Sequence, residues 1–336
     1  MEAVSMAFAL LGGVIGAGFA SGREILRFFA GHGRMAPAAI AAAGITLLVL
    51  YLRLAGQMHG VVSLLQLCRA KLGRRFGFFC GALFALLHAV TGAAMLAALA
   101  ELGALLLPVR HGYALSLIGS LLLAALLALW GVSGLALPGA LLMLVLPLFF
   151  MRLLALPAGE TCFLPAMTPD LPVRALCDGT AYGALSAAQT AGLLALLSAK
   201  TPRVRLQASL LFTLLFSVLL TLGTAVCRRH MPAIVHQTLP FVSLSRALGV
   251  SGYTLVALCM YGAALSTLSA MLRALMPPMP NARHALLAAA VCLALSQIGF
   301  EALIAHGYPL LGALCTGLLL VLCLPVCSQA ERTAAQ

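Results

Sequence analysis

Residues 12–24 read Gly12-Gly13-Val14-Ile15-Gly16-Ala17-Gly18-Phe19-Ala20-Ser21-Gly22-Arg23-Glu24. Five glycines in eleven positions lie in the middle of the first hydrophobic stretch, residues 4–30, and an arginine and a glutamate follow at once. Glycine weakens a helix by about 1 kcal/mol relative to alanine, so we expect this helix to unwind over residues 16–22. Backbone groups exposed at membrane depth are tolerated only where they line a cavity or bind a solute.

These glycines have a second interpretation, which is close helix packing. The pairs Gly12/Gly16 and Gly18/Gly22 both have the spacing that lets two membrane helices approach each other. The charged pair that follows favours a functional role, because intramembrane charges are costly and usually serve function. We therefore predict that Glu24 is a coupling or gating acid paired with Arg23 or Arg27. The residues predicted to contact substrate here are Gly16, Ala17, Gly18, Phe19, Ser21 and Gly22, with Arg23 and Glu24 in coupling or gating.

The composition restricts the class of protein. Of the 336 residues, 63% are hydrophobic and 8% are charged, and the mean hydropathy is +1.10. A soluble domain has about a quarter of its residues charged, so a soluble enzyme, a nucleic-acid-binding protein and a disordered chain are excluded. The net charge of +12 comes mainly from arginines scattered through short loops, which fits membrane topology better than nucleic-acid binding. We expect an all-α, polytopic membrane protein in contact with the lipid bilayer.

The hydrophobic pattern predicts ten membrane spans in one transmembrane domain covering residues 1–336. A division at 158–173 leaves five spans on each side, in repeats of about 4–157 and 174–327. Because five is odd, the second repeat must be inverted relative to the first, a plan that recurs in secondary transporters. The first helix of each repeat, helix 1 or helix 6, is interrupted by small and polar residues. The predicted spans are 4–30, 36–56, 77–106, 113–130, 134–157, 174–199, 204–227, 251–276, 284–304 and 307–327.

The basic residues predict the orientation in the membrane. With a cytoplasmic N-terminus, eleven Lys and Arg residues fall inside and seven outside, and the densest group, 69–75, is inside. Both termini are then cytoplasmic. The sequence around residues 61–75 predicts an amphipathic helix at the membrane surface, and residues 240–248 predict a short outer helix that covers a cavity.

The stretch from Gly13 to Ile25 resembles the opening of the YkvI-like bacterial membrane proteins. That family is classed with transporters, mostly without an assigned substrate, and is related to the amino acid–polyamine–organocation superfamily. The resemblance implies a LeuT-type fold with ten core helices in a five-plus-five inverted repeat, in which helices 1 and 6 are broken. It also implies a bacterial inner membrane and a small amino acid or related solute as substrate. At the level of motifs it is specific mainly for residues 13–25.

The sixth span supplies the partner of the broken first helix. Tyr182, Ser186 and Gln189 are predicted to contact substrate, in a stretch that also holds Gly183 and Thr190. The alternative is that the hydroxyls bond to their own backbone and that Gln189 bridges two helices. Asp178 and Glu301 lie near predicted membrane interfaces, where we expect them to be solvated or to form a gate.

Coupling ions have two candidate sites. In LeuT-like transporters, hydroxyls of helix 8 and carbonyls of helix 1 bind sodium, so the resemblance implies a sodium site at Ser266, Thr267 and Ser269 with Gly16 and Phe19. The alternative is that these hydroxyls only pack between helices. In the third span His88 either bonds to a neighbouring helix or belongs to a proton path. No other cofactor and no metal is expected.

These features predict a secondary active transporter of a small organic solute, working by alternating access and coupled to Na+ or H+. No catalytic motif is present, so we expect no enzymatic activity. The alternative function is a non-transporting receptor or assembly subunit on the same fold, similar to the membrane subunits of spore germinant receptors.

Overall fold

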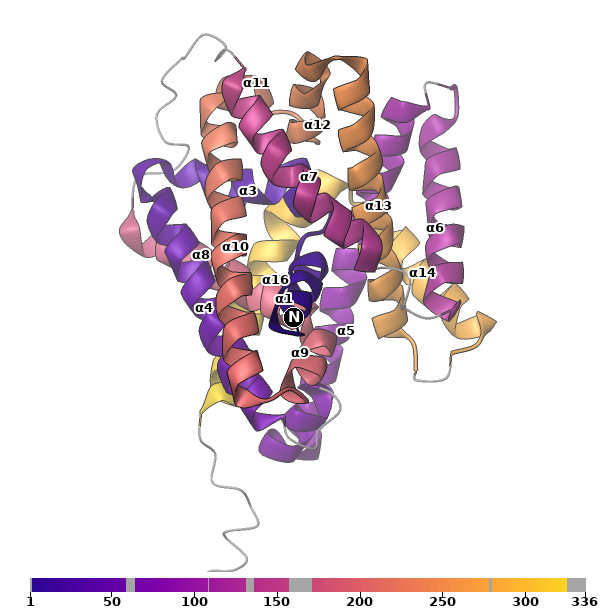
Figure 1. Ribbon diagram of the computed structural model, residues 1–336. Coiled ribbons are helices and arrows are strands. Elements are labelled where there is room, and N and C mark those ends of the chain that lie inside the picture. The colour runs from indigo at the N-terminus through magenta and orange to yellow at the C-terminus, as the bar shows by residue number, and fades with distance from the viewer. Residues whose placement is uncertain are drawn as a thin grey trace, which may run out of the picture.

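The computed structural model describes residues 2–58, 64–107, 109–130, 136–156, 171–277 and 280–324. These residues form a bundle of helices and contain no strand, which confirms the predicted all-α class (Figure 1). The elements are α1 (Glu2–Val14), α2 (Ala17–Ser21), α3 (Arg23–Phe28), η1 (Ala30–Met35), α4 (Ala36–Gln57), α5 (Leu64–Leu106), α6 (Gly112–Trp130), α7 (Ala136–Ala155), α8 (Pro172–Gln189), α9 (Ala191–Ser198), α10 (Pro202–Arg229), α11 (Met231–Ile234), α12 (Pro240–Ser245), η3 (Arg246–Leu248), α13 (Gly249–Leu275), α14 (Ala282–Ser296), α15 (Phe300–Ala302), η4 (Leu303–Gly307) and α16 (Tyr308–Cys323).

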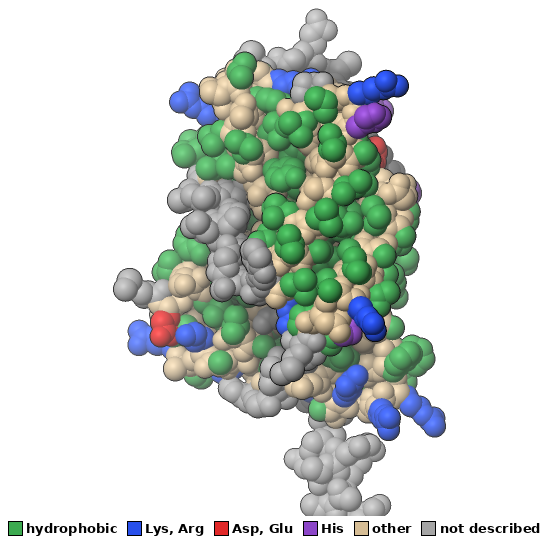
Figure 2. Space-filling view, turned by 90° about the vertical axis from the view of Figure 1, so that its right-hand side faces the viewer, with side chains coloured by type: hydrophobic (Ala, Val, Ile, Leu, Met, Phe, Trp, Pro, Cys, Tyr) green, Lys and Arg blue, Asp and Glu red, His purple; other side chains and the backbone are tan. Residues whose placement is uncertain are grey.

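The helices have the character of membrane spans. Within the described residues, six helical segments are long and apolar enough to cross a bilayer, and α1, residues 145–155 and α14 are shorter apolar helices. On α6 the side chains of Leu115, Ile118 and Leu122 are all more than half exposed, as expected of a surface that faces lipid. Figure 2 shows hydrophobic side chains over the middle of one face, with Lys and Arg mostly toward its two ends. The chain is a multi-pass membrane protein.

The described helices overlap each of the ten predicted spans, but one boundary is wrong. We expected a break between residues 304 and 307, whereas α14 ends at Ser296 and the chain turns at Gly299, which has a φ of 92°. The helix then runs from Phe300 through the π-helical turn η4 into α16. The wider π turn accommodates Pro309, which lacks an N–H. A hydropathy window of about 19 residues does not locate this break, because it averages Ser296, Gln297 and Glu301 with the longer apolar runs that flank them.

The two predicted surface helices are partly described. Residues 59–63 lie outside the described part of the chain, and Leu64 to Leu72 form the first turns of α5 before a bend at Gly73, where φ is 81°. The short helix expected at 240–248 is present as α12 and η3. Gly22 has a φ of 88°, and a Cβ there would lie 3.1 Å from the ring of Phe241, so α12 covers the end of α2. The expected division of the repeats at 158–173 falls mostly outside the described residues.

The closest helix packing in the centre joins α4 to α8. Gly179 and Gly183, one turn apart on α8, face Ala39 and Ala43, one turn apart on α4. A Cβ on Gly183 would lie 2.7 Å from the carbonyl oxygen of Ala43, and one on Gly179 would overlap the carbonyl of Ala39. The small residues of the sixth span therefore serve helix packing on this face, and they position the opposite face of α8 toward α3 and α16.

We predict that Gly183→Val destabilises the protein by about 1–3 kcal/mol, because the added atoms force α4 and α8 apart. The measurement is thermal unfolding of the purified protein in detergent. Gly119→Val is the matched control, since Gly119 is exposed on α6 and has open space beside it. Equal melting temperatures for the two variants would contradict the packing described here.

Candidate functional site

The first predicted span is interrupted at two points. Helix α1 ends at Val14, Gly16 is extended with a φ of −98° and a ψ of −170°, and the chain turns again at Gly22. The expected unwinding over residues 16–22 is therefore wrong in extent, because Ala17–Ser21 forms the short helix α2. The N–H of Ala20 reaches the carbonyl of Gly16 at 3.0 Å, so α2 satisfies part of its own backbone. Two short breaks replace one long one.

The second break places Glu24 in the interior of the bundle. Its side chain is only 6% exposed, and its Oε2 accepts a hydrogen bond of 2.8 Å from the hydroxyl of Tyr182 on α8. The carboxyl group folds back over α2, where a Cβ on Gly18 would overlap it. The glycine at position 18 therefore makes room for the carboxyl group of Glu24.

Neither arginine pairs with Glu24, contrary to our expectation. Arg23 forms an ion pair with Glu301 and donates hydrogen bonds to the carbonyls of Val235, at 2.8 Å, and Gln237, at 3.1 Å. These contacts join α3 to α15 and to the segment before α12.

Arg27 faces a different carboxylate, Asp178 at the start of α8. The distance from Arg27 to Asp178 is 3.4 Å, and Asp178 also lies 3.0 Å from Nε2 of His32. Both acids expected to be solvated or to form a gate, Asp178 and Glu301, therefore contact arginines of α3. No salt bridge of Glu24 occurs among the described residues.

Aromatic rings surround Glu24 and separate it from water. Tyr182 is 1% exposed, stacks on Phe216 at a centroid distance of 6.2 Å, and also contacts Phe28 and Phe29. Phe19, predicted to contact substrate, is fully buried against Phe216. Its side chain belongs to this aromatic core.

Tyr308 is a central residue that the sequence interpretation missed. Its buried hydroxyl lies beside Thr91 and Gln189 but makes no hydrogen bond of normal length and angle. A buried polar group without a partner costs about 1–3 kcal/mol, so this hydroxyl is available to a solute or a water molecule. The only sequence signal was a tyrosine in a hydrophobic span, directly before a proline.

A cavity of about 400 Å³ reaches Gln189 from the end of the bundle where α9 lies. Its lining comes from four parts of the chain and includes predicted site residues of α5, α8 and α13, whereas its two glycines of α1 had not been predicted. Gly12 and Gly13 come from α1, His88 from α5, Gln189 from α8, and Ser266 and Thr267 from α13. A Cβ on Gly16 would lie 3.3 Å from Oγ1 of Thr267, so α13 packs directly against the first break.

Most of the predicted polar groups bond to their own helix, which the alternative interpretation proposed only for the hydroxyls of the sixth span. The hydroxyls of Ser21, Ser186, Ser266, Thr267 and Ser269 donate to backbone carbonyls three or four residues earlier, at 2.8–3.0 Å. Nδ1 of His88 lies 2.6 Å from the carbonyl of Phe84 on its own helix, whereas one interpretation expected a bond to a neighbouring helix. Gln189 bridges α8 to α5 through a 3.1 Å hydrogen bond to Thr91. The hydroxyl oxygens of Ser266 and Thr267 still have lone pairs when they donate to the backbone. These hydrogen bonds are not themselves evidence for a sodium site.

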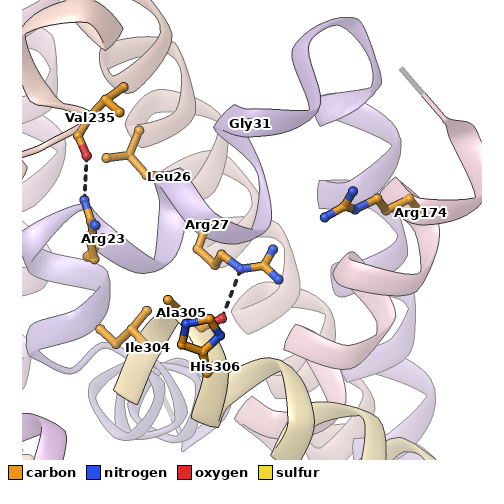
Figure 3. Close-up of a pocket in the computed structure, with 9 residues that line it drawn as sticks. All are labelled: Arg23, Leu26, Arg27, Gly31, Arg174, Val235, Ile304, Ala305 and His306. Carbon is orange, nitrogen blue, oxygen red and sulfur yellow. Dashed lines mark hydrogen bonds between the residues drawn. The ribbon is translucent and has the colours of Figure 1, made fainter. Parts of the chain in front are cut away.

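A second cavity, of about 380 Å³, lies at the end of the bundle where α11 and α12 are found (Figure 3). Arg23 and Arg27 of α3 line it, together with Arg174 of α8 and His306 of η4. In the described residues, no group of three or more His, Cys, Asp or Glu is placed to hold a metal ion.

Comparison with known proteins adds no identification, since no family model and no curated protein matches the chain. The resemblance of residues 13–25 to the YkvI-like proteins therefore stays a prediction.

We predict that Tyr182→Phe lowers the free energy of unfolding by about 1–3 kcal/mol, because the buried carboxyl group of Glu24 loses its hydrogen-bond partner. Thermal unfolding in detergent measures the change. Tyr113→Phe is the control, since Tyr113 is 44% exposed. If both phenylalanine variants unfold like the wild type, the Tyr182 hydroxyl does not stabilise Glu24.

Proposed function

We propose that the protein is a secondary transporter of a small organic solute, and that it works by alternating access in a ten-helix, five-plus-five arrangement of the LeuT type. The observation that supports this most strongly is the position of Glu24. Gly12 and Gly13 line the cavity at the α9 end, and Arg23 and Arg27 line the cavity at the α12 end. Glu24 thus lies in the segment from α1 to α3, which lines one cavity at its beginning and the other cavity at its end.

The contacts at the α12 end support the idea of a gate. Arg23 joins α3 to Glu301 and to two backbone carbonyls near α12, and Phe241 packs on Gly22. An ion pair that is partly exposed contributes little to stability and can be broken at small cost. Opening this contact and closing the α9 end would expose the central residues to the opposite side of the membrane. In the proposed orientation, the α9 end and both termini face the cytoplasm of a bacterial inner membrane.

The surroundings of Glu24 favour H+ over Na+ as the coupling ion. An ionised carboxylate is costly in an apolar environment without a cation, and protonation removes that cost. The hydroxyl of Tyr182 serves both forms, because it donates to an ionised carboxylate and accepts a hydrogen bond from a protonated one. Sodium coupling through Ser266, Thr267 and Ser269 is the second candidate, supported by the contact between Thr267 and Gly16.

The experiment that tests the proposal is uptake into proteoliposomes from a pooled mixture of amino acids and organic acids. Proton and sodium gradients are imposed separately. We expect a solute to accumulate under the proton gradient and to equilibrate without accumulation when that gradient is removed. If solutes bind but none accumulates under either gradient, the transport proposal is wrong, and the receptor or assembly subunit becomes the better explanation.

We predict that Glu24→Gln abolishes accumulation driven by the proton gradient while the variant remains folded. Glutamine keeps the size of the side chain and a hydrogen-bonding oxygen for Tyr182 but carries no titrating proton. Glu2→Gln is the matched control, because the Glu2 side chain is 68% exposed and lies 3.4 Å from Lys200 at the surface. Accumulation in the Glu24 variant equal to that of the control would assign Glu24 a structural role.

A further inference from the structure

The cavity at the α12 end differs in charge from the cavity at the α9 end. Its lining contains three arginines and one histidine, and the rest of the lining is apolar or glycine: Leu26, Gly31, Val235, Ile304 and Ala305. Figure 3 shows the guanidinium groups of Arg27 and Arg174 pointing toward one another across the cavity, with the ring of His306 below them. The cavity at the α9 end has one titratable lining residue, His88.

Three carboxylates among the described residues belong to this region, namely Glu301, Glu101 and Asp178. Glu301 is engaged by Arg23. Glu101 also lies near Arg23, and Asp178 faces Arg27 at 3.4 Å, His32 at 3.0 Å, and Arg174 at longer range. Among the described residues, Asp178 is therefore the carboxylate that faces both Arg27 and Arg174.

The two arginines are placed to bind a carboxylate. The contact between Arg27 and Asp178 is long for an ion pair. The Nε of Arg27 also reaches the carbonyl oxygen of Ala305 only at 3.4 Å. Arg174 and His306 are exposed, so the cavity is accessible to a solute. Guanidinium groups bind carboxylates through two parallel hydrogen bonds, and like charges lining a cleft attract ions of opposite sign. A volume of about 380 Å³ is within the range of small-molecule sites.

We propose that this cavity is the outer binding site for the transported solute and that it selects small organic anions through Arg27 and Arg174. The inference rests on the proposed function, because it names the chemical class of that solute. Arg23 already holds Glu301, so the first contact of the anion is with Arg27 and Arg174. Leu26 and Ile304 supply an apolar wall for the carbon skeleton.

Binding to the purified full-length protein in detergent tests the proposal, with isothermal titration calorimetry as the readout. The probes are succinate, inorganic phosphate and succinamide, the neutral diamide of succinate. We expect succinate to bind at least about tenfold more tightly than succinamide, because charge-assisted hydrogen bonds are lost in the amide. Tighter binding of phosphate than of succinate would contradict selection for organic anions. Equal binding of succinate and succinamide, or no binding of either, would overturn the proposal.

Variants assign the binding to this cavity. We expect Arg174→Gln and Arg27→Gln each to weaken succinate binding about tenfold, and Arg27→Lys to weaken it less. Arg203→Gln is the matched control, because Arg203 is exposed at the start of α10, at the α9 end. Because Arg174 is exposed, replacing it does not disturb the core. Succinate binding can therefore be measured with the Arg174 variant even if the Arg27 variant fails to fold. Unchanged affinity in the Arg174 variant and in any folded Arg27 variant would overturn the assignment.

The binding and uptake experiments together distinguish a failure of anion selection from a failure of the transport proposal. Succinate binding that depends on Arg27 and Arg174, without accumulation under any gradient, would contradict transport and leave an anion-binding site. Gradient-driven accumulation of neutral solutes, with no preference for succinate over succinamide, would support transport and overturn anion selection.

Discussion

The organisation of the centre depends on one buried interaction, the 2.8 Å hydrogen bond between Glu24 and Tyr182. A carboxyl group in a helical membrane bundle must have its polar atoms satisfied within the protein. Three local features make this possible: Gly18 leaves space for the carboxyl group, the turn at Gly22 directs α3 toward α8, and aromatic rings exclude water. The close packing of α4 against Gly179 and Gly183 holds the helix that carries Tyr182.

The two ends of the bundle differ in chemistry around this centre. At the α9 end the cavity is mostly apolar and reaches Gln189, Ser266 and Thr267. At the α12 end, arginines of α3 contact Glu301 and Asp178, which lie on two different helices. The segment that carries Glu24 runs between these two ends, so a rearrangement of this segment changes the contacts at both. Such an arrangement suits a protein that binds a solute from one side and releases it to the other.

The sequence contained the information for the membrane class and for the location of the breaks. Composition and hydropathy predicted an all-α membrane protein, and the glycines of residues 12–22 placed the interruption in the correct helix. Both follow from local properties, namely the apolar character of the spans and the weak helix propensity of glycine. The boundary near Gly299 was misplaced because a long hydropathy window averages the few polar residues around it with the apolar runs on both sides.

The partners of the charged residues could not be predicted, because they come from distant parts of the chain. Glu24 and Tyr182 are 158 positions apart, and Arg23 and Glu301 are 278 apart. Local spacing instead favoured an ion pair of Glu24 with a neighbouring arginine, which is wrong. The role of Gly18 also depends on tertiary structure, since only the folded chain brings the carboxyl group of Glu24 over it. For Ser186 the sequence left two interpretations open, and its hydroxyl bonds to the backbone, as one of them proposed. Ser266 does the same, which neither of its interpretations had considered.

The central claim, that Glu24 exchanges a proton inside the bundle, is tested most directly by infrared difference spectroscopy of the protein in lipid. The carbonyl stretch of a protonated carboxylic acid is separate from the bands of ionised carboxylates. We predict that the wild type shows such a band, that the band decreases as the pH is raised, and that it is missing from Glu24→Gln. A band that is identical in the two proteins, or the lack of any such band in the wild type at every pH, would contradict the claim.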